Sequence, residues 1–394
     1  MTDYTQFSCP NQSCNLFNQT NQGNIAHRSW TGKEKCIERL RCTCCKKEFS
    51  SRRGTLLEYA KISDKQQIKM LKCMRWCVCE EGIADICGVT RVTVRLFQEK
   101  AATRAKHHHD NTVHSVNEEG AQCDELYAKL AGKKSWLGAA IGMQSLMILA
   151  ISVGQRKQEM ADVLAANLWA RCIQLRMLLT DGWAPYFSAF LRCFGKVYQP
   201  RRKAGKGRRF SKRIKFSQSL FYGQVIKRAQ KVSNKWQLKQ VVIRAMNDRI
   251  EHCKRFIQAY KLGNTIHTSH IERWFGSLRN SVGCLRRRSR CPVSLTNRLE
   301  EKVWIFVSLY NWVLPHGSLT KNKSKRTPAM AAGLIDRPMS YKEYVYLPVH
   351  KDGLLTRIID QKLSEIQSKQ MKKAAKRSSK PPPDEEILWQ KEVV

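Results

Sequence analysis

Acidic side chains are scarce in this sequence. Its 394 residues include 32 Asp and Glu against 71 Lys and Arg, which gives a formal net charge of +39. An excess of this size makes a chain repel itself and favours a polyanionic partner. Nucleic acid is the partner we expect, because Lys and Arg release condensed counterions from phosphates when they bind. A ribosomal-type or membrane-surface protein is the alternative that charge alone leaves open.

The sequence also lacks a long apolar run. Its most apolar stretch, residues 136–153, contains two glycines together with Gln144 and Ser145, so it does not predict a transmembrane helix. The first four residues (MTDY) are polar and do not predict a secretory signal. We therefore expect a cytoplasmic protein without a membrane partner. Its 16 cysteines are expected to be reduced thiols or metal ligands rather than disulfides.

The cysteines before residue 50 predict a structural zinc site. Cys9-x4-Cys14 and Cys42-x2-Cys45 offer two thiolate pairs, and four thiolates can surround one zinc ion tetrahedrally. The segment is polar and rich in Asn and Gln, so a metal would stabilise what a small core cannot. Cys36 and Cys44 are spare, and ordinary reduced thiols are the alternative. We expect a zinc-finger DNA-binding region over residues 1–58.

Residues 59–106 predict a helix-turn-helix domain. The segment 83–87 fits a first short helix, Gly88 and Val89 fit a turn, and Thr90 fits the cap of a second helix. The second helix would place its N-terminal residues against base edges in the major groove. Arg91, Thr93 and Arg95 are therefore the expected DNA contacts. A purely structural pair of helices is the alternative.

A polar linker is predicted over residues 107–119, in which the three consecutive histidines 107–109 are expected to be solvated. The pattern then changes to three strands, a helix, a strand, a helix and a strand. The predicted strands cover 122–129, 136–142, 146–153, 175–180 and 196–198, and the predicted helices cover 158–173, 184–194, 269–279 and 294–312. This order predicts an α/β domain with a mixed sheet over residues 120–348. A basic tail, 349–394, is expected to be helical at first and then disordered.

Three carboxylates stand out in this basic chain because of where they fall in the predicted elements. Asp124 lies in the first strand of the α/β domain, Asp181 follows a strand directly, and Glu272 lies near the start of a helix. Each alone also fits a turn or a helix cap. Together they could hold two Mg²⁺ or Mn²⁺ ions, which activate a nucleophile and stabilise the leaving oxygen of a phosphodiester. Glu125 competes with Asp124, and the alternation of a strand predicts that only one of the two joins the site.

Basic residues around this domain are expected to contact the DNA backbone. A dense basic run after residue 200 fits contacts to phosphates, and a solvated loop is the alternative. Glu272 and Arg279 are close to two helical turns apart, so they share one face. Trp274 either stacks on a flipped base or packs in the core, and His316 is expected to be structural. The expected backbone contacts are Arg201, Arg202, Arg208, Arg209, Arg273, Arg279 and Arg287.

Three segments resemble the acidic motifs of bacterial insertion-sequence transposases of the DDE superfamily. They are CDELY at 123–127, LLTDGW at 178–183, and the Glu272-Arg273-x5-Arg279 pattern, which is the most specific of the three. The segments LYNW at 309–312 and TPAMAAGL at 327–334 resemble the end of such domains. The cysteine pairs and the helix-turn-helix fit the subgroup with a two-part DNA-binding head. The resemblance covers roughly residues 9–348.

The resemblance implies an RNase H-like fold, a mixed sheet with flanking helices, with Asp124, Asp181 and Glu272 as ligands of two magnesium ions. It also implies an enzyme that binds the terminal inverted repeats of its own element, cleaves DNA there and transfers the strands to target DNA. Such a protein would be nucleoid-associated. Because two ends are handled together, a homodimer or a higher oligomer is expected. The alternatives are a transposase-derived regulator without activity and an RNase H-like structure-specific nuclease.

Overall fold

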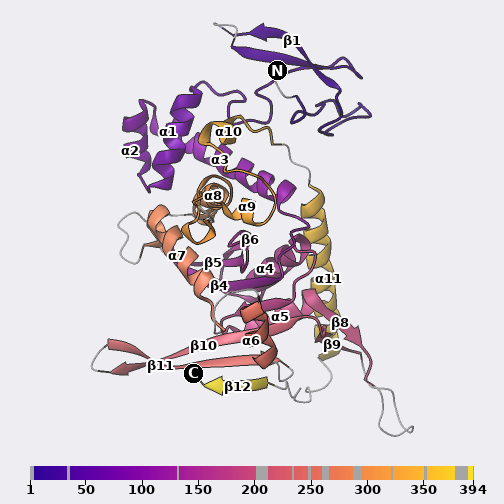
Figure 1. Cartoon of the computed structure of the whole chain (residues 1–394), viewed down its shortest axis with the longest axis vertical. Coiled ribbons are helices and arrows are strands. Elements are labelled where there is room, and N and C mark those ends of the chain that lie inside the picture. Colours follow the sequence, from indigo (N-terminus) through magenta and orange to yellow (C-terminus); the bar gives the residue numbers. More distant parts are fainter. Residues whose placement is uncertain are drawn as a thin grey trace. The chain divides into compact units, whose positions relative to one another are not determined.

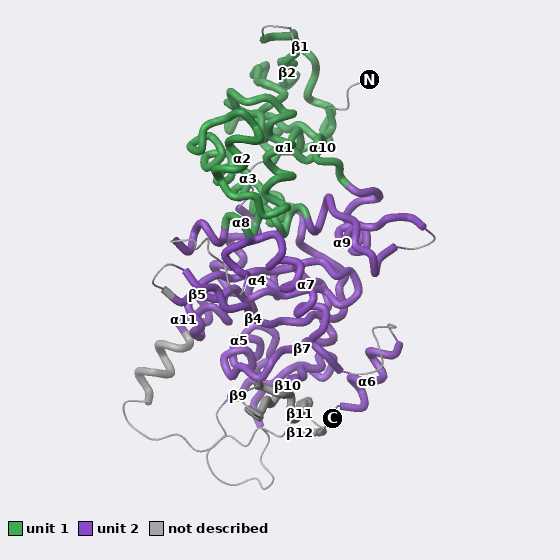
Figure 2. Tube along the Cα trace, turned by 90° about the vertical axis from the view of Figure 1, so that its left-hand side faces the viewer, with its two compact units in different colours: residues 1–111, 301–309, 339–352 green, residues 112–300, 310–338, 353–394 purple. Residues whose placement is uncertain are grey.

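The computed structural model describes residues 4–32, 36–130, 133–200, 212–232, 235–246, 250–259, 266–286, 295–320, 323–349, 353–377 and 389–393, with the backbone alone described at 133, 227–232, 235–246, 369–377 and 389–393. The chain divides into two compact units (Figure 2). The first comprises residues 1–111, 301–309 and 339–352, and the second comprises residues 112–300, 310–338 and 353–394. The first unit, which contains the cysteine-rich head, therefore also includes residues 301–309 and 339–352. From the sequence we expected these residues to belong to the α/β domain and the basic tail. None of the described helices is long and apolar enough to cross a membrane.

The N-terminal part of the first unit is a small antiparallel sheet. Its strands are β1 (Ile25–Thr31), β2 (Ile37–Cys42) and β3 (Glu48–Ser50), with β2 in the centre. The core beneath them is small, because it consists of Phe7, Ile25, Leu40 and Phe49 together with buried cysteines. A core of this size gains much of its stability from a metal or another cross-link.

The rest of the first unit is helical, with α1 (Asp64–Arg75), α2 (Glu80–Cys87), α3 (Arg91–Thr112) and α10 (Tyr341–Tyr346). Gly88 ends α2 at φ 64, a left-handed conformation that glycine adopts without strain. The Thr90 hydroxyl accepts a hydrogen bond from the Thr93 N–H at 3.2 Å, so the predicted turn and cap are confirmed.

The predicted linker begins too early. Helix α3 continues to Thr112, and His108 and His109 are 7% and 1% exposed, so the expectation that they are solvated is wrong. Alanines 101, 102 and 105 explain the difference, because they favour the helix and are buried with it. Burial lowers the pKa of His108 to about 3, which keeps that ring neutral.

Arg104 of α3 ties three separate segments of the first unit together. Its side chain is buried, and its guanidinium donates to the carbonyl of Gly54 at 3.0 Å, of Tyr344 at 3.0 Å and of Leu347. A buried guanidinium needs such acceptors, because leaving it without them would cost several kcal/mol. These bonds join the end of the cysteine-rich head to α3 and to the segment after α10.

Replacing Arg104 by Met should therefore destabilise the first unit. We expect a loss of about 3 kcal/mol in the free energy of unfolding, because three buried carbonyls lose a charged donor. Urea unfolding followed by circular dichroism measures this. The matched control is Arg95→Met, which removes an exposed arginine from the same helix. Equal midpoints for the two variants would contradict the role given to Arg104.

The second unit is built on one seven-stranded sheet, ordered β12-β11-β10-β7-β4-β5-β6 (Figure 1). Strands β4, β5 and β6 form an antiparallel meander, β7 runs parallel to both β4 and β10, and β11 and β12 add antiparallel strands at the far edge. All four residues of β7 are buried, as expected of a central parallel strand. The strands are β4 (Gly120–Leu130), β5 (Lys133–Gly142), β6 (Ile148–Gly154), β7 (Met177–Thr180), β10 (Phe221–Val232), β11 (Lys235–Met246) and β12 (Trp389–Val393).

Helices cover both faces of this sheet. A side chain at Gly138 of β5 would meet Leu164 of α4, whereas Ile141 of the same strand lines a cavity with Trp274 of α7. Side chains three residues apart on a strand point to opposite faces, so α4 and α7 lie on opposite sides. The helices of this unit are α4 (Gln158–Arg171), α5 (Ala184–Phe194), α6 (Ile250–Ala259), α7 (Ser269–Ser281), α9 (Pro328–Ala331) and α11 (Leu354–Arg377). Helix α8 (Thr296–Ser308) continues into a π-helical turn at Leu309–Val313.

All of the predicted elements between residues 122 and 198 are present, but the last strand lies outside the main sheet. The predicted strand 196–198 is β8 (Gly195–Tyr198), which pairs with β9 (Arg213–Phe216) in a separate two-stranded sheet. The place beside β7 belongs to β10, where we expected a basic stretch and predicted no strand. Its apolar residues, including Tyr222 and Val225, are interleaved with polar and basic ones, which hid the strand. The end of the tail also differs from the expected disorder, because it contains β12, which pairs with β11.

Candidate functional site

Four cysteines of the first unit converge as predicted. The sulfur atoms of Cys9, Cys14, Cys42 and Cys45 all lie within 4.8 Å of one another, and the sulfurs of Cys9 and Cys45 are 3.4 Å apart. Four thiolates at this spacing could hold a metal such as zinc. The spare Cys36 and Cys44 are exposed and lie outside the group, as do the cysteines of α1 and α2.

Hydrogen bonds to Cys42 and Cys45 favour the thiolate form that a metal needs, whereas burial raises the pKa of Cys9. The N–H of Lys47 and the side chain of Asn11 lower the pKa of Cys45 to about 6. The amide of Asn24 donates to the sulfur of Cys42 at 3.3 Å. Lys46 adopts φ 61 and its N–H bonds to the Cys42 carbonyl at 2.9 Å, which makes the tight turn between the last two ligands. The donor set therefore fits a structural zinc ion.

Three carboxylates come together where β4 and β7 run side by side in the second unit. The register pairs Cys123 with Thr180, so the next residues, Asp124 and Asp181, are neighbours at the end of β7. Carboxylate oxygens of Asp124, Glu125 and Asp181 all lie within 4.8 Å of one another. Glu125 does point to the opposite face of the strand from Asp124, but the expectation that this keeps it out of the group is wrong. The reason is that Asp181 lies beyond the end of its strand, within reach of both faces.

Glu272 approaches this group from α7, although its carboxylate lies outside the 4.8 Å set, and Gln122 fixes the first turn of that helix. The Gln122 side chain is fully buried, its oxygen accepts the N–H groups of His270 at 3.0 Å and Ile271 at 3.3 Å, and its nitrogen donates to the His267 carbonyl at 2.9 Å. These two N–H groups belong to the first turn of α7, where the helix itself supplies no acceptor. Gln122 precedes Asp124 by two residues and points to the same face, so it sets the distance between Asp124 and α7.

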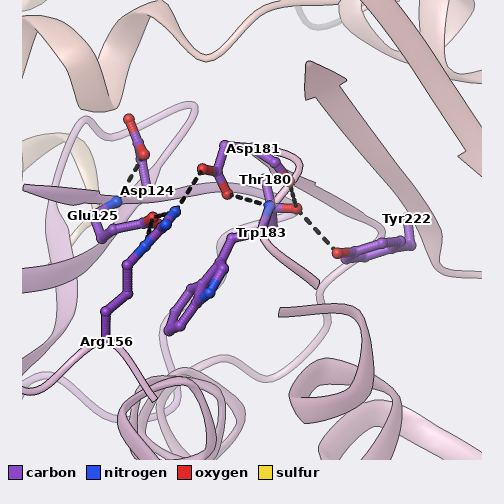
Figure 3. Close-up of polar contacts among 7 residues, drawn as sticks. All are labelled: Asp124, Glu125, Arg156, Thr180, Asp181, Trp183 and Tyr222. Carbon is purple, nitrogen blue, oxygen red and sulfur yellow. Dashed lines mark hydrogen bonds and ion pairs between the residues drawn. The ribbon is translucent and has the colours of Figure 1, made fainter. Parts of the chain in front are cut away.

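Asp124, Asp181 and Glu272 line one open cleft of about 500 Å³, whereas Glu125 is not among its lining residues. Thr268 also lines it, and its hydroxyl donates to the Glu272 carboxylate at 2.8 Å. Arg156, from the turn between β6 and α4, enters the cleft and pairs with Glu125 (Figure 3). The Asp181 carboxylate is oriented by the N–H of Trp183 at 3.0 Å. The lining residues are Asp124, Arg156, Asp181, Gly182, Trp183, Ala184, Val225, Ile226, Thr268 and Glu272.

The carboxylates of the cleft repel one another. Burial and, next, the nearby Asp181 carboxylate raise the pKa of Asp124 to about 7. Burial is also the main reason that the pKa values of Glu125 and Asp181 are raised. Divalent cations bound between these groups would remove the repulsion and favour the ionised forms. The donor set is oxygen only, which suits Mg²⁺ or Mn²⁺.

Asp124→Asn should consequently stabilise the protein in buffer without added Mg²⁺ or Mn²⁺ at pH 8. The Asp124 pKa is about 7 in the folded chain and about 4 in an unfolded one, so stability is lost as the pH rises from about 4 to 7, and Asn removes that cost. At pH 4 the unfolded chain also takes up much of this proton, so the two proteins should unfold at more nearly the same temperature. Differential scanning fluorimetry at both pH values measures this. A variant that is less stable than wild type at pH 8 would contradict the crowded-carboxylate account.

Other residues singled out in the sequence have different positions. Trp274 is 2% exposed, so it packs in the core of the second unit and does not present a stacking surface. Asn311 is also buried, and its side chain bonds both the N–H and the carbonyl of Ile148 at 3.0 Å, which is a structural role. Arg273 is exposed and Arg279 is half-buried on α7. Arg201, Arg202, Arg208, Arg209 and Arg287 lie outside the described residues.

The three candidate DNA contacts of the helix-turn-helix differ in their surroundings. Arg91 is held by carboxylates of α2, because it lies 2.8 Å from Glu81 and 3.6 Å from Glu80. Arg95 is exposed and has no carboxylate partner among the described residues, whereas Thr93 is half-buried beside the cap. Arg95 is therefore the more available cation of the two.

Sequence reasoning missed Gln122, Arg156 and Thr268. A polar residue two positions before Asp124 in an apolar strand was a signal for Gln122. Arg156 gave no signal, because it lies in a polar turn of ordinary composition. No protein-family model and no curated protein sequence matches this chain. The geometry of the two sites therefore carries the functional argument.

Proposed function

We propose that this chain is a DNA transposase of the DDE superfamily, with an RNase H-like catalytic domain and a zinc-containing DNA-binding head. The observation that carries the proposal is the meeting of Asp124, Asp181 and Glu272 in one cleft, although they are far apart in the sequence. They come from a central strand, the end of its parallel neighbour and a nearby helix, as the three acidic motifs require.

The strand order supports the RNase H-like part of the proposal. An antiparallel meander is followed by a helix, a strand parallel to the first strand of the meander, and a further helix and strand. In the order β6-β5-β4-β7-β10, Asp124 lies on one central strand and Asp181 directly follows the neighbouring one. The last strand of this order is β10 and not the one expected from the sequence, but the sheet is complete.

The residues of the cleft fit the proposed chemistry of two divalent ions. Asp124, Asp181 and Glu272 would hold the ions, and Thr268 and the Trp183 N–H orient two of the carboxylates. When bound, the ions would supply a deprotonated water or 3′-hydroxyl and neutralise charge on the phosphodiester. The protein's own part is to fix the ligands: Gln122 holds α7 against β4, and the parallel register holds Asp181 beside Asp124.

The head would bring the element ends to this cleft. The four-cysteine group would hold a structural zinc ion, and α3 would present Arg95 to the major groove. Two ends would be handled by two copies of the chain, so a homodimer or a larger assembly bound to DNA is part of the proposal. The net charge of +39 supports a DNA partner in all of these steps.

The test is strand cleavage on DNA taken from both sides of the gene. We expect wild-type protein with Mg²⁺ to cut at defined positions that flank an inverted repeat, and Ca²⁺ to support binding without cutting. Specific binding without cleavage would instead indicate a DNA-binding regulator. Cleavage of branched DNA without end preference would indicate a structure-specific nuclease with the same cleft.

A further inference from the structure

Arg156 is a basic residue placed inside an acidic cleft. Its Nε donates to the Glu125 carboxylate at 2.7 Å, its Nη2 contacts the same oxygen, and Nη2 lies 3.9 Å from the Asp181 carboxylate (Figure 3). The side chain of Glu125 is only 2% exposed, whereas that of Arg156 is 37% exposed. The ion pair therefore anchors one edge of the guanidinium and leaves part of the group open to the cleft.

Two tryptophans hold the plane of this guanidinium. Its central carbon lies 4.8 Å from the ring centroid of Trp136 and 5.0 Å from that of Trp183. Indole faces attract guanidinium groups, so the two contacts limit how the side chain can turn. One ring comes from β5 and the other from the loop after Asp181, which fixes Arg156 relative to both central aspartates.

The fixed guanidinium still has hydrogen-bonding capacity. Both of its contacts to Glu125 use Nε and Nη2, and Nη1 has no hydrogen-bond partner among the described residues. Arg156 is also the one basic residue among those that line the cleft in the described part of the chain. A structural ion pair would need neither a second unoccupied nitrogen nor an opening to the cleft.

The charge balance of the cleft favours an anionic ligand at this position. Asp124, Glu125, Asp181 and Glu272 carry four negative charges when ionised, and Arg156 carries one positive charge. Two divalent cations would leave a single net positive charge. One phosphodiester would then make the site neutral. Without Arg156 the metal-loaded site would already be neutral, and binding the phosphodiester would leave it with one uncompensated negative charge.

We infer that Arg156 binds the phosphodiester group at which the DNA is cut. Glu125, which the three-acid motif leaves without a role, is the residue that positions this arginine. Arginine suits the task because its planar fork can hold Glu125 with one edge and a phosphate oxygen with the other. The inference rests on the proposed function, since it names the ligand of the same cleft.

The experiment measures whether Arg156 and the charge of that phosphate act on each other. Duplexes containing the mapped cleavage position are made with an ordinary phosphate or with a neutral methylphosphonate there. Binding is measured by fluorescence anisotropy in Ca²⁺, so that no cleavage is involved. Wild type is compared with Arg156→Gln, Arg156→Lys and Arg192→Gln. The last is a matched control, because Arg192 pairs with Asp162 outside the cleft.

We expect wild type and Arg192→Gln to lose roughly tenfold more affinity on the methylphosphonate duplex than Arg156→Gln does, which corresponds to one charged hydrogen bond. Arg156→Lys keeps the charge and should show an intermediate difference, and it covers the case in which Arg156→Gln does not fold. Equal losses for all four proteins would overturn the inference and leave the proposed function intact. A wild-type protein that cuts no flanking DNA would contradict the proposed function, and the inference with it.

Discussion

Asp181→Asn and Glu272→Gln should each abolish cleavage of the element ends and leave binding to them nearly unchanged. Both substitutions keep the size of the side chain and remove a charge that would hold a divalent ion. A lost ligand in a two-metal site removes activation of the nucleophile and stabilisation of the leaving oxygen, so we expect a fall in the single-turnover rate of roughly a thousandfold or more.

The matched control for these two variants is Glu119→Gln. Glu119 lies one residue before β4 and pairs with Arg176 at 3.4 Å, and it does not line the cleft. We expect the control to cleave within about threefold of wild type, because surface ion pairs contribute little. Cleavage by Asp181→Asn at the wild-type rate would show that the cleft is not the catalytic site.

Cys42→Ser should unfold the cysteine-rich head and remove specific binding to the element ends. The head has a core of only a few apolar side chains, and the sulfur of Cys42 is buried among the other three. Metal binding and folding are coupled in domains of this kind, so loss of one ligand lowers both. We expect one zinc ion less per chain by mass spectrometry and an end affinity that falls to the non-specific level.

The matched control here is Cys44→Ser. Cys44 lies between the last two ligands in the turn, but it is exposed and outside the four-cysteine group. It should retain zinc and bind specifically. Salt-dependent, non-specific binding should remain in both variants, since the basic charge of the chain is unchanged. If Cys42→Ser retained its zinc, the assignment of the four ligands would be wrong.

Local patterns in the sequence predicted the parts of the fold that depend on local physics. Paired cysteine spacing predicted the four thiols, because both pairs lie in tight turns that bring their sulfurs together. Gly88 and Thr90 predicted the turn and the cap between α2 and α3, because a left-handed residue and a hydroxyl cap are needed there. Apolar periodicity predicted the elements from β4 to α5. In each case the residues that decide the structure are neighbours in the chain.

Long-range packing was not predictable in the same way. Strand β10 lies in a basic stretch whose composition does not indicate a strand of the main sheet. Its place in that sheet follows only from its pairing with β7. The first unit contains residues 339–352, whose carbonyls accept hydrogen bonds from Arg104, and nothing in the sequence around either partner indicates this. Strand alternation predicted that Glu125 and Asp124 would not share one site. That rule does not apply here, because Asp181 lies beyond the end of its strand and is close to both side chains.

The acidic residues of the candidate site were predicted from the sequence, but the residues that hold them in position were not. Asp124, Asp181 and Glu272 were found because charged residues at strand and helix ends are conspicuous in a basic, apolar-patterned domain. The amide of Gln122 bonds to the first turn of α7, and the guanidinium of Arg156 bonds to Glu125 on β4. Such roles follow from three-dimensional neighbours. The structure therefore shows which residues hold the cleft in shape and where Arg156, the one basic residue among its described lining residues, lies.

The most direct test of the central claim, that the acidic cleft binds catalytic metal ions, is the anomalous scattering of Mn²⁺ in crystals of the full chain. The account predicts two manganese peaks in the cleft, with oxygens of Asp124, Asp181 and Glu272 as ligands, and their loss in Asp181→Asn. Crystals of wild type that bind Mn²⁺ elsewhere and leave the cleft without a peak, at a concentration that supports cleavage, would contradict it.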